Sequence, residues 1–519
     1  MKSATPQTEL PPSTRLRKAV FGGAHYLIVA ALNRAASKSN VLLVIATIWL
    51  SCASIALGAN RYVDPASASP TPPYTSWTTA AHTIPVALGV CTPGDVVIVA
   101  NGVYTLTSQI IVPGGVWLTC LSGPANATIN GNGVTRCVYM PGAGSGLGGF
   151  TITGGKAQTG AGIYCVGGTV TNCVITNNQA VGDAPKGGGV YCDGGTISHC
   201  VISGNSVTST NTYLYGAFAE GGGIYAVNQS QIDHSTVVNN SLNGYYSNGG
   251  GINANGGSVQ YCTVSGNTAY GHWYANGGGV YMTADLIRNC LITDNNAHTD
   301  RNAYSAYWAS GGGVYFNGGG TLESSTVYGN TLDGDMSTGG GLTYGGQIRN
   351  TIIYGNTATA RMTADGPNYY LNSYGPATFD HCCSTPLPAG VGNIASAPGF
   401  ISGGYHLNTG SPCIDTGTNQ AWMATATDLD GNPRIANGTV DMGVYERSVS
   451  APQLTIIRSV ANVILRWPTN AAGFTLQSTT NLVSPAVWST VSPAPVVVNG
   501  QNAVTNPVSG TKKFYRLSQ

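Results

Sequence analysis

Short segments of alternating apolar and polar residues recur along the middle of the chain, and each begins with a glycine block. The blocks follow at steps of 27 to 34 residues and start at Gly160, Gly187, Gly221, Gly249, Gly277, Gly311 and Gly339. A second β-branched segment lies downstream in each repeat, and no helical 3.6-residue period fits between the two. Repeats of this length that hold only short strands predict a β-solenoid.

The strand after each glycine block has two distinct faces. Positions such as Val190, Ile224 and Val280 are apolar in successive repeats, so we expect them to point inward. The next residue points to the opposite face of a strand. It forms a tyrosine-rich column that we predict to face outward: Tyr164, Tyr191, Tyr225, Asn253, Tyr281, Tyr315 and Thr343.

An asparagine closes the second segment of every repeat. It recurs at Asn178, Asn205, Asn240, Asn267, Asn295, Asn330 and Asn356. Asparagine tolerates the left-handed conformation of tight turns, and stacked side-chain amides can bond from one coil to the next. We therefore predict a turn with this asparagine in the left-handed conformation and an internal asparagine ladder.

Together, the glycine triplet followed by Val or Ile and Tyr, and the later Asn-Cys-x-Ile-x-x-Asn, resemble the repeats of right-handed parallel β-helix proteins. These include bacterial polymorphic outer-membrane proteins and adhesin-like passenger domains. The resemblance covers residues 60–380 and implies an all-β chain built on a right-handed parallel β-helix, a solenoid. Lyases, hydrolases, adhesins and structural proteins all use this fold, so the resemblance alone indicates no activity.

The N-terminal residues 1–59 resemble a signal peptide with a long basic region, an apolar run from Val41 to Leu57 and cleavage after Ala59. The run of about 17 residues leaves a retained membrane anchor as the alternative. We expect an exported chain, secreted or at the cell surface, in a bacterial extracellular or outer-membrane-associated location. An amphipathic helix over Thr79 to Leu88 is predicted to cover the first coil, although Pro85 interrupts it.

Two further segments follow the repeats. Residues 381–447 include Gly410-Ser-Pro-Cys-Ile-Asp-Thr-Gly417 and resemble the choice-of-anchor Q domain of secreted bacterial β-helix proteins, which implies a C-terminal cap. Residues 448–452 form a linker. Residues 453–519 alternate in short strands separated by turn signals, which predicts a small β-sandwich. Its Phe-Tyr-Arg-Leu end is similar to non-catalytic C-terminal modules used in sorting or surface attachment.

The charge composition of the chain limits the classes of molecule that the protein is expected to bind. The net charge is +1, charged residues make up 8% of the chain, and no basic run is present. Because nucleic acids require a concentrated positive footprint, we exclude them as partners. We predict a polysaccharide or another cell-surface component as the partner, with membrane contact only through the leader or an anchoring system.

Cysteines recur in matching columns of successive coils, as Cys165 with Cys192, Cys173 with Cys200 and Cys262 with Cys290. Export permits disulfides, and strands about 4.8 Å apart lie within disulfide range. Parallel Cα–Cβ bonds nevertheless give poor torsions, so buried free thiols are favoured and disulfides are the alternative. No Cys/His spacing indicates a zinc site.

Catalytic residues cannot be named from the sequence. In the first-strand column Asp193 is followed by Val227 and Asn255, so no carboxylate pair forms there for hydrolysis. Asp428 and Asp430 are weak candidates for binding Ca²⁺, but a structural role in their turn is favoured. We predict no other cofactor.

Aromatic residues gather between the asparagine turn and the next glycine block in consecutive repeats. The candidate ligand-binding residues are Tyr213, Tyr215, Tyr245, Tyr246, Tyr270, Trp273, Tyr274, Tyr304, Tyr307 and Trp308, with Phe218 beside them. We expect them in loops on one edge of the solenoid. Flat rings with polar rims suit stacking on sugars, and the alternative is that the rings pack on one another.

The leading hypothesis is a secreted or cell-surface, non-catalytic, adhesin-like β-helix protein that binds glycan or another surface. The first alternative is a polysaccharide lyase or glycoside hydrolase, similar to pectate lyases. The second alternative is a structural surface protein without a ligand.

Overall fold

The computed structural model describes residues 58–211, 217–283, 285–300, 307–371, 377–447, 453–469, 474–483, 486–508 and 512–518. Residues 1–57 of the predicted leader, the linker and three candidate residues, Tyr213, Tyr215 and Tyr304, lie outside the described residues. Within the described part, no helix is long and apolar enough to span a membrane.

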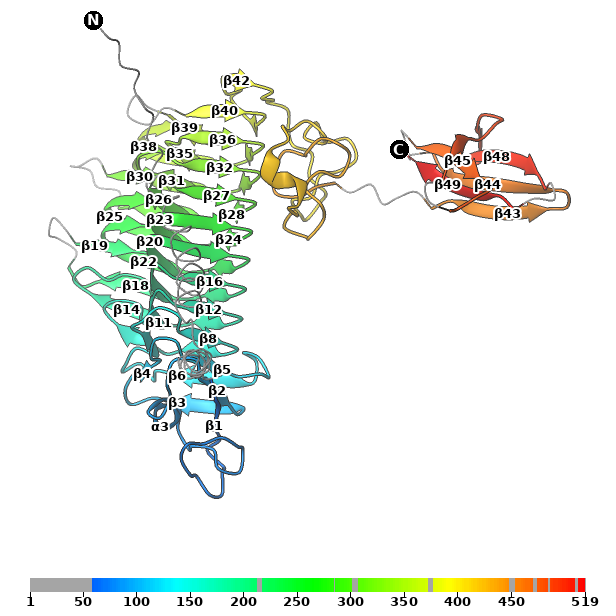
Figure 1. The fold of residues 1–519 in the computed structure, drawn as a ribbon. Helices are drawn as coiled ribbons and strands as arrows, with labels where there is room; N and C mark the ends of the chain where they lie inside the picture. Colours follow the sequence, from blue (N-terminus) through cyan, green and yellow to red (C-terminus); the bar gives the residue numbers. More distant parts are fainter. Residues whose placement is uncertain are drawn as a thin grey trace, which may run out of the picture. The chain divides into compact units, whose positions relative to one another are not determined.

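Three parallel sheets, here called A, B and C, wind through the repeats to form a right-handed parallel β-helix (Figure 1). Sheet A holds β1 (Asn60–Val63), β2 (Val96–Val99), β4 (Ile110–Ile111), β5 (Trp117–Thr119), β7 (Val138–Met140), β8 (Gly146–Gly148), β11 (Ile163–Val166), β12 (Thr169–Thr171), β15 (Val190–Asp193), β16 (Thr196–Ser198), β20 (Ile224–Asp233), β23 (Ile252–Gln260), β26 (Val280–Thr283), β27 (Leu286–Arg288), β31 (Val314–Phe316), β32 (Thr321–Glu323), β35 (Leu342–Thr343), β36 (Gln347–Arg349), β39 (Tyr369–Tyr370), β40 (Thr378–Asp380) and β42 (Gly390–Val391).

Sheets B and C complete each coil. Sheet B holds β3 (Gly102–Thr105), β6 (Ala127–Asn130), β9 (Thr151–Thr153), β13 (Val174–Thr176), β17 (Val201–Ser203), β21 (Thr236–Val238), β24 (Thr263–Ser265), β28 (Leu291–Thr293), β33 (Thr326–Tyr328), β37 (Ile352–Tyr354) and β41 (Cys383–Ser384). Sheet C holds β10 (Lys156–Ala157), β14 (Gln179–Gly182), β18 (Ser206–Ser209), β19 (Phe218–Glu220), β22 (Ser241–Asn248), β25 (Thr268–Asn276), β29 (Asn296–Thr299), β30 (Trp308–Ser310), β34 (Thr331–Thr338) and β38 (Thr357–Asp365).

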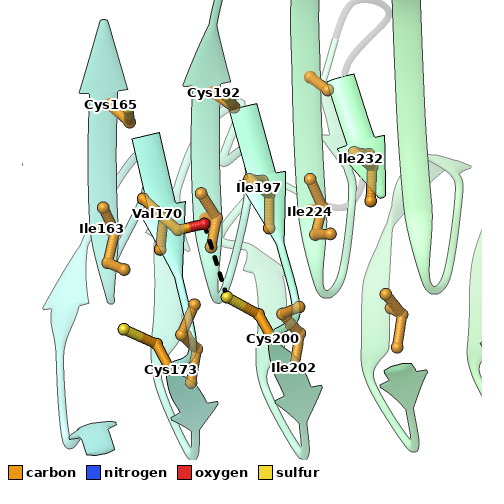
Figure 2. Close-up of a cluster of buried hydrophobic side chains, with 14 of the residues drawn as sticks. Ile163, Cys165, Val170, Cys173, Cys192, Ile197, Cys200, Ile202, Ile224 and Ile232 are labelled. Carbon is orange, nitrogen blue, oxygen red and sulfur yellow. Dashed lines mark hydrogen bonds between the residues drawn. The ribbon is translucent and has the colours of Figure 1, made fainter. Parts of the chain in front are cut away.

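The apolar columns of the repeats form the core, as predicted. Val190 pairs in register with Ile224, and Cys192 pairs with Ala226. Val190, Ile224 and Val280 are fully buried. Figure 2 shows Ile163, Val170, Ile197, Ile224 and Ile232 among the buried side chains of neighbouring strands. The inward assignment of the first strand is therefore confirmed. In the column predicted to face outward, Tyr225, Asn253 and Thr343 are buried.

The asparagine ladder is also confirmed. In each step a side-chain amide donates to the side-chain oxygen of the next asparagine; Asn240 Nδ2 to Asn267 Oδ1 measures 3.0 Å. The backbone N–H of Asn240 donates to the same oxygen at 3.0 Å, and Asn267 is fully buried. The left-handed residue is the one before the ladder asparagine, such as Asn239 with φ of 54°. Our turn assignment was therefore wrong by one position, because the ladder asparagine turns its side chain inward while its predecessor makes the corner.

The glycine triplets are required by the closeness of neighbouring coils. Gly277 has a φ of +67°, which side-chain-bearing residues adopt only with strain. A Cβ atom on Gly278 would lie 2.4 Å from the carbonyl carbon of Asn296 and 2.5 Å from the Gly312 oxygen. Larger residues at these bends would push the coils apart.

The predicted N-terminal helix is shorter than expected. Helix α3 spans Ile84–Leu88 and buries Ile84, Ala87 and Leu88. Proline lacks an N–H group and is favoured in the first turn, so Pro85 marks the beginning of the helix. The expected start at Thr79 was wrong for this reason.

Residues 398–446 form a segment with little regular structure, here called the flank segment, with one 3₁₀ helix, η1 (Ala421–Ala424). Its contacts fall on the sides of the last coils: Val444 N–H donates to Thr326 Oγ1 at 3.1 Å, and Asn350 Nδ2 donates to the Thr418 carbonyl at 2.9 Å. The end coil instead pairs with Gly390–Val391 through β40. The boundaries of the choice-of-anchor Q assignment remain a prediction.

The C-terminal module contains two antiparallel sheets, as expected for a small β-sandwich. One holds β43 (Thr455–Ser459), β44 (Asn462–Pro468), β47 (Val496–Val498) and β48 (Gln501–Pro507), and the other holds β45 (Thr475–Thr479), β46 (Ser489–Thr490) and β49 (Phe514–Ser518). Leu465, Trp467, Leu476, Val491 and Val504 form its core. This core is separate from the core of the solenoid.

Candidate functional site

The described candidate aromatics lie mostly in strands of sheet C and not in loops. The long strands of this sheet bend near Gly244, Gly271 and Gly334, and register shifts occur at two of these positions. A Cβ atom on Gly244 would lie 2.7 Å from the Cβ of Ala219, so only glycine fits inside the bend. The loop prediction was wrong because the extra residues of each repeat lengthen the strand and fold it back on itself.

The two arms of each bend share a small core of their own. It is separate from the main core and consists largely of alanine: Ala161, Ala180, Val207, Ala219, Leu242, Ala269, Ala275, Ala297, Ala309 and Leu332. Side chains this small let the two arms approach closely. The larger side chains on both arms consequently point away from this core.

One outer row of rings runs along the returning arms. Phe218 pairs in register with Tyr246, Tyr246 with Tyr274, and Tyr274 with Trp308. The ring centroids of Phe218 and Tyr246 are 4.8 Å apart, and those of Tyr246 and Tyr274 are 5.6 Å apart. Phe218 is exposed and the other three are half-buried.

A second row lies at the bends and includes Tyr245, Trp273 and Tyr307. The ring centroids of Tyr245 and Trp273 are 5.9 Å apart, and those of Trp273 and Tyr307 are 5.1 Å apart. We call the two rows the aromatic surface: Phe218, Tyr245, Tyr246, Trp273, Tyr274, Tyr307 and Trp308. Because most of these rings stack on one another along the solenoid, they present mainly edges to solvent.

The tyrosine column of sheet A also consists of stacked rings. Tyr164 and Tyr191 stack at 4.4 Å, and Tyr281 and Tyr315 stack at 5.3 Å with planes 8° apart. Asn253 interrupts the column between Tyr225 and Tyr281. The predicted column therefore exists as two stacks.

A polar column joins the aromatic surface to the tyrosine column. It consists of the residue before each glycine block, paired from coil to coil: Thr159, Lys186, Glu220, Asn248, Asn276, Ser310 and Thr338. Asn253 Nδ2 donates to Glu220 Oε1 and to the Asn248 carbonyl, both at 3.3 Å. The tyrosine column therefore lies within hydrogen-bonding distance of the polar column. We call the combined surface the aromatic corner.

Sequence reasoning missed the polar column. Its signal was available, because each member directly precedes a glycine block, but the residue type changes from repeat to repeat. Only the position is periodic. An alignment of the repeats on their glycines would have shown a column that is polar throughout.

Lys186 and Glu220 form the charged part of the aromatic corner. Lys186 Nζ lies 2.5 Å from Glu220 Oε2 and 3.2 Å from the Tyr225 hydroxyl. Burial lowers the pKa of Lys186, but the hydrogen bonds and charges of Glu220 and Tyr225 outweigh burial and raise the pKa. The ammonium group therefore stays protonated and acts as a donor.

The phenols of the corner are also held in their protonated form. Burial, followed by the charge of Glu220, raises the pKa of Tyr225, and the same two causes raise the pKa of Tyr281 to about 12. Burial is likewise the largest cause that raises the pKa of Tyr315. General bases require a pKa near the working pH. These groups are suited to hydrogen bonding and not to proton abstraction.

Tyr270 lies apart from the aromatic surface, on the outgoing arm of its strand, and pairs with His298. Its hydroxyl donates to Asp300 Oδ1, and His272 Nδ1 lies 2.8 Å from Asp300 Oδ2. Burial raises the pKa of Asp300, but the hydrogen bonds from Tyr270 and His272 outweigh burial and lower the pKa. No group of three metal-ligating side chains occurs among the described residues.

The two calcium candidates have different surroundings. Asp428 is buried, and its oxygens accept hydrogen bonds from the backbone of Asp430, Asn432 and Glu446. Asp430 is paired with His406 at 2.6 Å. Asp428 therefore organises the turn with its own oxygens, in keeping with the structural role favoured from the sequence.

A buried carboxylate in the flank segment gives a pH prediction. Glu446 Oε1 lies 3.0 Å from Arg434 Nη2, with Asp428 and Asp441 nearby in the same cluster. Burial outweighs the attraction of Arg434 and raises the pKa of Glu446 to about 8. The folded state therefore binds this proton more tightly than the unfolded chain, whose pKa is about 4.3. Stabilisation by protonated Glu446 is complete below about pH 4 and is lost as the pH rises through about 8.

We expect the melting temperature of the solenoid with its flank segment to fall between about pH 5 and pH 9. Glu446→Gln removes this titration and keeps the shape of the side chain, so its melting temperature should depend less on pH. Differential scanning calorimetry of both proteins measures the two slopes. Equal slopes would show that Glu446 is already ionised in the fold.

Comparisons with known proteins identify no relative by sequence: no family model matches the chain, and no curated protein matches it. Among solved structures, pectate lyase Pel9A is 17% identical with a TM-score of 0.42, covering 76% of this chain and 98% of its own. A variant of the PL6 family alginate lyase AlyGC is 13% identical with a TM-score of 0.28, covering 60% of this chain and 52% of its own. XylC in complex with xylose is 11% identical with a TM-score of 0.31, covering 86% of this chain and all of its own.

The class of the protein follows from its own parallel sheets: it is a right-handed parallel β-helix protein that carries a C-terminal module of antiparallel strands.

Proposed function

We propose that this chain is a non-catalytic β-helix protein, secreted or displayed at the cell surface, that binds a neutral glycan along the aromatic corner. The observation that carries the proposal is the polar column beside the aromatic rims of consecutive coils. Its members Glu220 and Asn276 are half-buried, while Asn248, Ser310 and Thr338 are buried. Sugars combine C–H faces with hydroxyl groups, and such a surface offers partners for both.

The electrostatics favour a neutral ligand. Lys186 is already engaged by Glu220, and Arg136 is engaged by Gln109 and by the carbonyls of Thr159 and Gly160. An acidic polysaccharide would therefore find the charge of Lys186 compensated by Glu220, whereas Arg136 donates to neutral acceptors and keeps its positive charge. Neutral hydroxyl groups can instead reach Asn276 of the polar column, which is half-buried and donates to Asn248 Oδ1 at 3.0 Å. Ser310 is buried and hydrogen-bonded to Thr338.

The protonation of the corner favours binding over catalysis. A lyase needs a base that can remove a proton near neutral pH. Lys186, Tyr225 and Tyr281 all have raised pKa values and hold their protons. The lyase or hydrolase alternative therefore has no base among these three residues.

The double variant Tyr246→Ala and Tyr274→Ala is expected to weaken glycan binding about 5- to 150-fold, since each ring contributes about 0.5 to 1.5 kcal/mol. Binding to immobilised neutral glycans measures the loss. Tyr261→Asn is the matched control, because Tyr261 is also half-buried and stacked, with His234 at 4.6 Å, but lies at a different turn.

Three results would contradict the proposal. Unchanged binding by a folded double variant would place the ligand elsewhere. Equal losses in the double variant and in Tyr261→Asn would show a general effect on stability. Turnover of neutral or acidic polysaccharides, with or without Ca²⁺, would replace the proposal with the enzyme alternative.

The proposal also covers the cellular location of the protein and the roles of its N-terminal and C-terminal segments. We assign residues 1–59 as the leader, residues 381–447 as the choice-of-anchor Q-like domain and residues 453–519 as a sorting or attachment module. Fractionation of producing cells with a tag at the C-terminus tests the assignment. Recovery of the full-length chain in the cytoplasm alone would contradict it.

A further inference from the structure

Buried cysteines occur as neighbours in several coils. The described cysteines are all thiols, and Cys165 pairs in register with Cys192 on adjacent parallel strands. Figure 2 shows the same side-by-side arrangement for Cys173 and Cys200, whose thiols point into the core. Their Cα–Cβ bonds run nearly parallel, which is unfavourable for the torsion of a disulfide. Stacking of equivalent positions is enough to explain these pairs.

Cys383 and Cys413 have a different relationship. Cys383 lies in β41 of the solenoid and pairs with Ile352, while Cys413 comes from the flank segment. Both cysteines are fully buried, and they share one cluster with Ile352, Leu407 and Met442. This cluster is where the flank segment covers the outer face of sheet B.

The two thiols therefore approach each other from opposing layers. A hydrogen bond with Cys413 is the largest cause that raises the pKa of the Cys383 thiol, as a hydrogen bond with Cys192 is for Cys165. What distinguishes Cys383 and Cys413 is therefore their position across two layers in one cluster. The Cys383 thiol also donates to the Ser396 carbonyl at 3.2 Å. Side chains that face each other across two layers can reach the torsions that parallel neighbours cannot.

We propose that Cys383 and Cys413 are the site of a disulfide that fastens the flank segment to the last coil of the solenoid. The co-reactant is a small-molecule disulfide such as oxidised glutathione. One cysteine thiolate attacks a glutathione sulfur to form a mixed disulfide and releases one glutathione thiolate. The second cysteine thiolate then attacks the protein sulfur and releases the other glutathione.

The reaction is balanced. Two protein thiols lose two electrons and two protons, and one oxidised glutathione becomes two reduced molecules. Because both cysteines are fully buried in the fold, the exchange takes place during folding, before the flank segment closes. The product closes a loop between residues 383 and 413 and restricts the unfolded chain, which stabilises the fold.

The experiment compares the full chain refolded with oxidised glutathione and with excess reduced glutathione. Free thiols are then alkylated, and the chain is digested with chymotrypsin without reduction. Trypsin is unsuitable because the chain has no Lys or Arg between Arg361 and Arg434, whereas Phe400 and Tyr405 lie between the two cysteines. We expect peptides containing Cys383 and Cys413 to remain joined only after oxidative refolding. Their mass should be two hydrogens below the sum of the Cys413 peptide and the Cys383 peptide alkylated once at Cys382.

The variant Cys413→Ser should lose the joined peptides and melt at a lower temperature than the oxidised chain, and added reductant should abolish this difference. Cys200→Ser is the matched control, since it removes one of two buried neighbouring thiols for which we expect no disulfide, and it should keep the joined Cys383 and Cys413 peptides. In the unaltered chain Cys173 and Cys200 should be alkylated in every sample. Should Cys413→Ser fail to fold, the peptide masses from the unaltered chain still test whether Cys383 and Cys413 form a disulfide. Complete alkylation of Cys383 and Cys413 after oxidative refolding, or linkage of Cys173 to Cys200 instead, would overturn the proposal.

Discussion

Val280→Asp is expected to destabilise the solenoid by roughly 3 to 5 kcal/mol, because it buries a carboxylate that has no partner. Val280 is fully buried in β26 and stands in register between Ile252 and Val314. Each coil of a solenoid is held mainly by its neighbours, so a defect in the middle uncouples the two halves. Chemical denaturation should show a lower midpoint and two separate transitions.

The control for this variant lies three residues away. Thr283 belongs to the same strand but points outward, and its hydroxyl donates to Asn255 Oδ1 at 2.6 Å. Thr283→Asp adds the same carboxylate at a solvent-accessible position and should change the stability by less than about 1 kcal/mol. Similar midpoints for the two variants would show that the inward column does not carry the stability of the stack.

Asn267→Leu is expected to destabilise the fold by about 3 kcal/mol or more, since it leaves several buried groups without partners at about 1 to 3 kcal/mol each. Asn267 Oδ1 accepts from the backbone N–H and the side-chain amide of Asn240, both at 3.0 Å. Asn267 Nδ2 donates to the Val237 carbonyl at 2.8 Å. Leucine has a similar size and provides none of these bonds.

The matched control is Asn255→Leu, because Asn255 is exposed and lies outside the ladder. Urea denaturation of both variants separates the buried network from a general effect of losing asparagine. If both variants unfold at the same urea concentration, the ladder contributes no more than a surface amide does.

The main architecture could be predicted because the interactions that produce it are local and repeated. Val280 and Tyr281 are adjacent, and strand geometry alone places them on opposite faces. The same residue types then recur one coil later, so each inward side chain meets its equivalent in the next repeat. The ladder of Asn240 and Asn267 follows from the same register.

The candidate site was less accessible to sequence reasoning. The concentration of rings at Tyr246, Tyr274 and Trp308 was visible, but their placement in folded-back strands depends on Gly244 and on the alanine core beneath them. Short alanine side chains carry little hydrophobic pattern, so the sequence predicts loops where the structure has strands. The residues Glu220 and Asn248 were missed because only their position is periodic.

The sequence by itself determined the parallel coils, the inward columns and the asparagine ladder, because a repeated strand can bury its apolar face only against its own copies. Only the tertiary structure decided which surfaces meet: Asn253 beside Glu220 at the aromatic corner, and Cys383 beneath Cys413 at the flank segment. Such contacts join residues with no common period in the chain. They depend on how sharply the chain bends at each glycine and on where the non-repeating flank segment comes to rest.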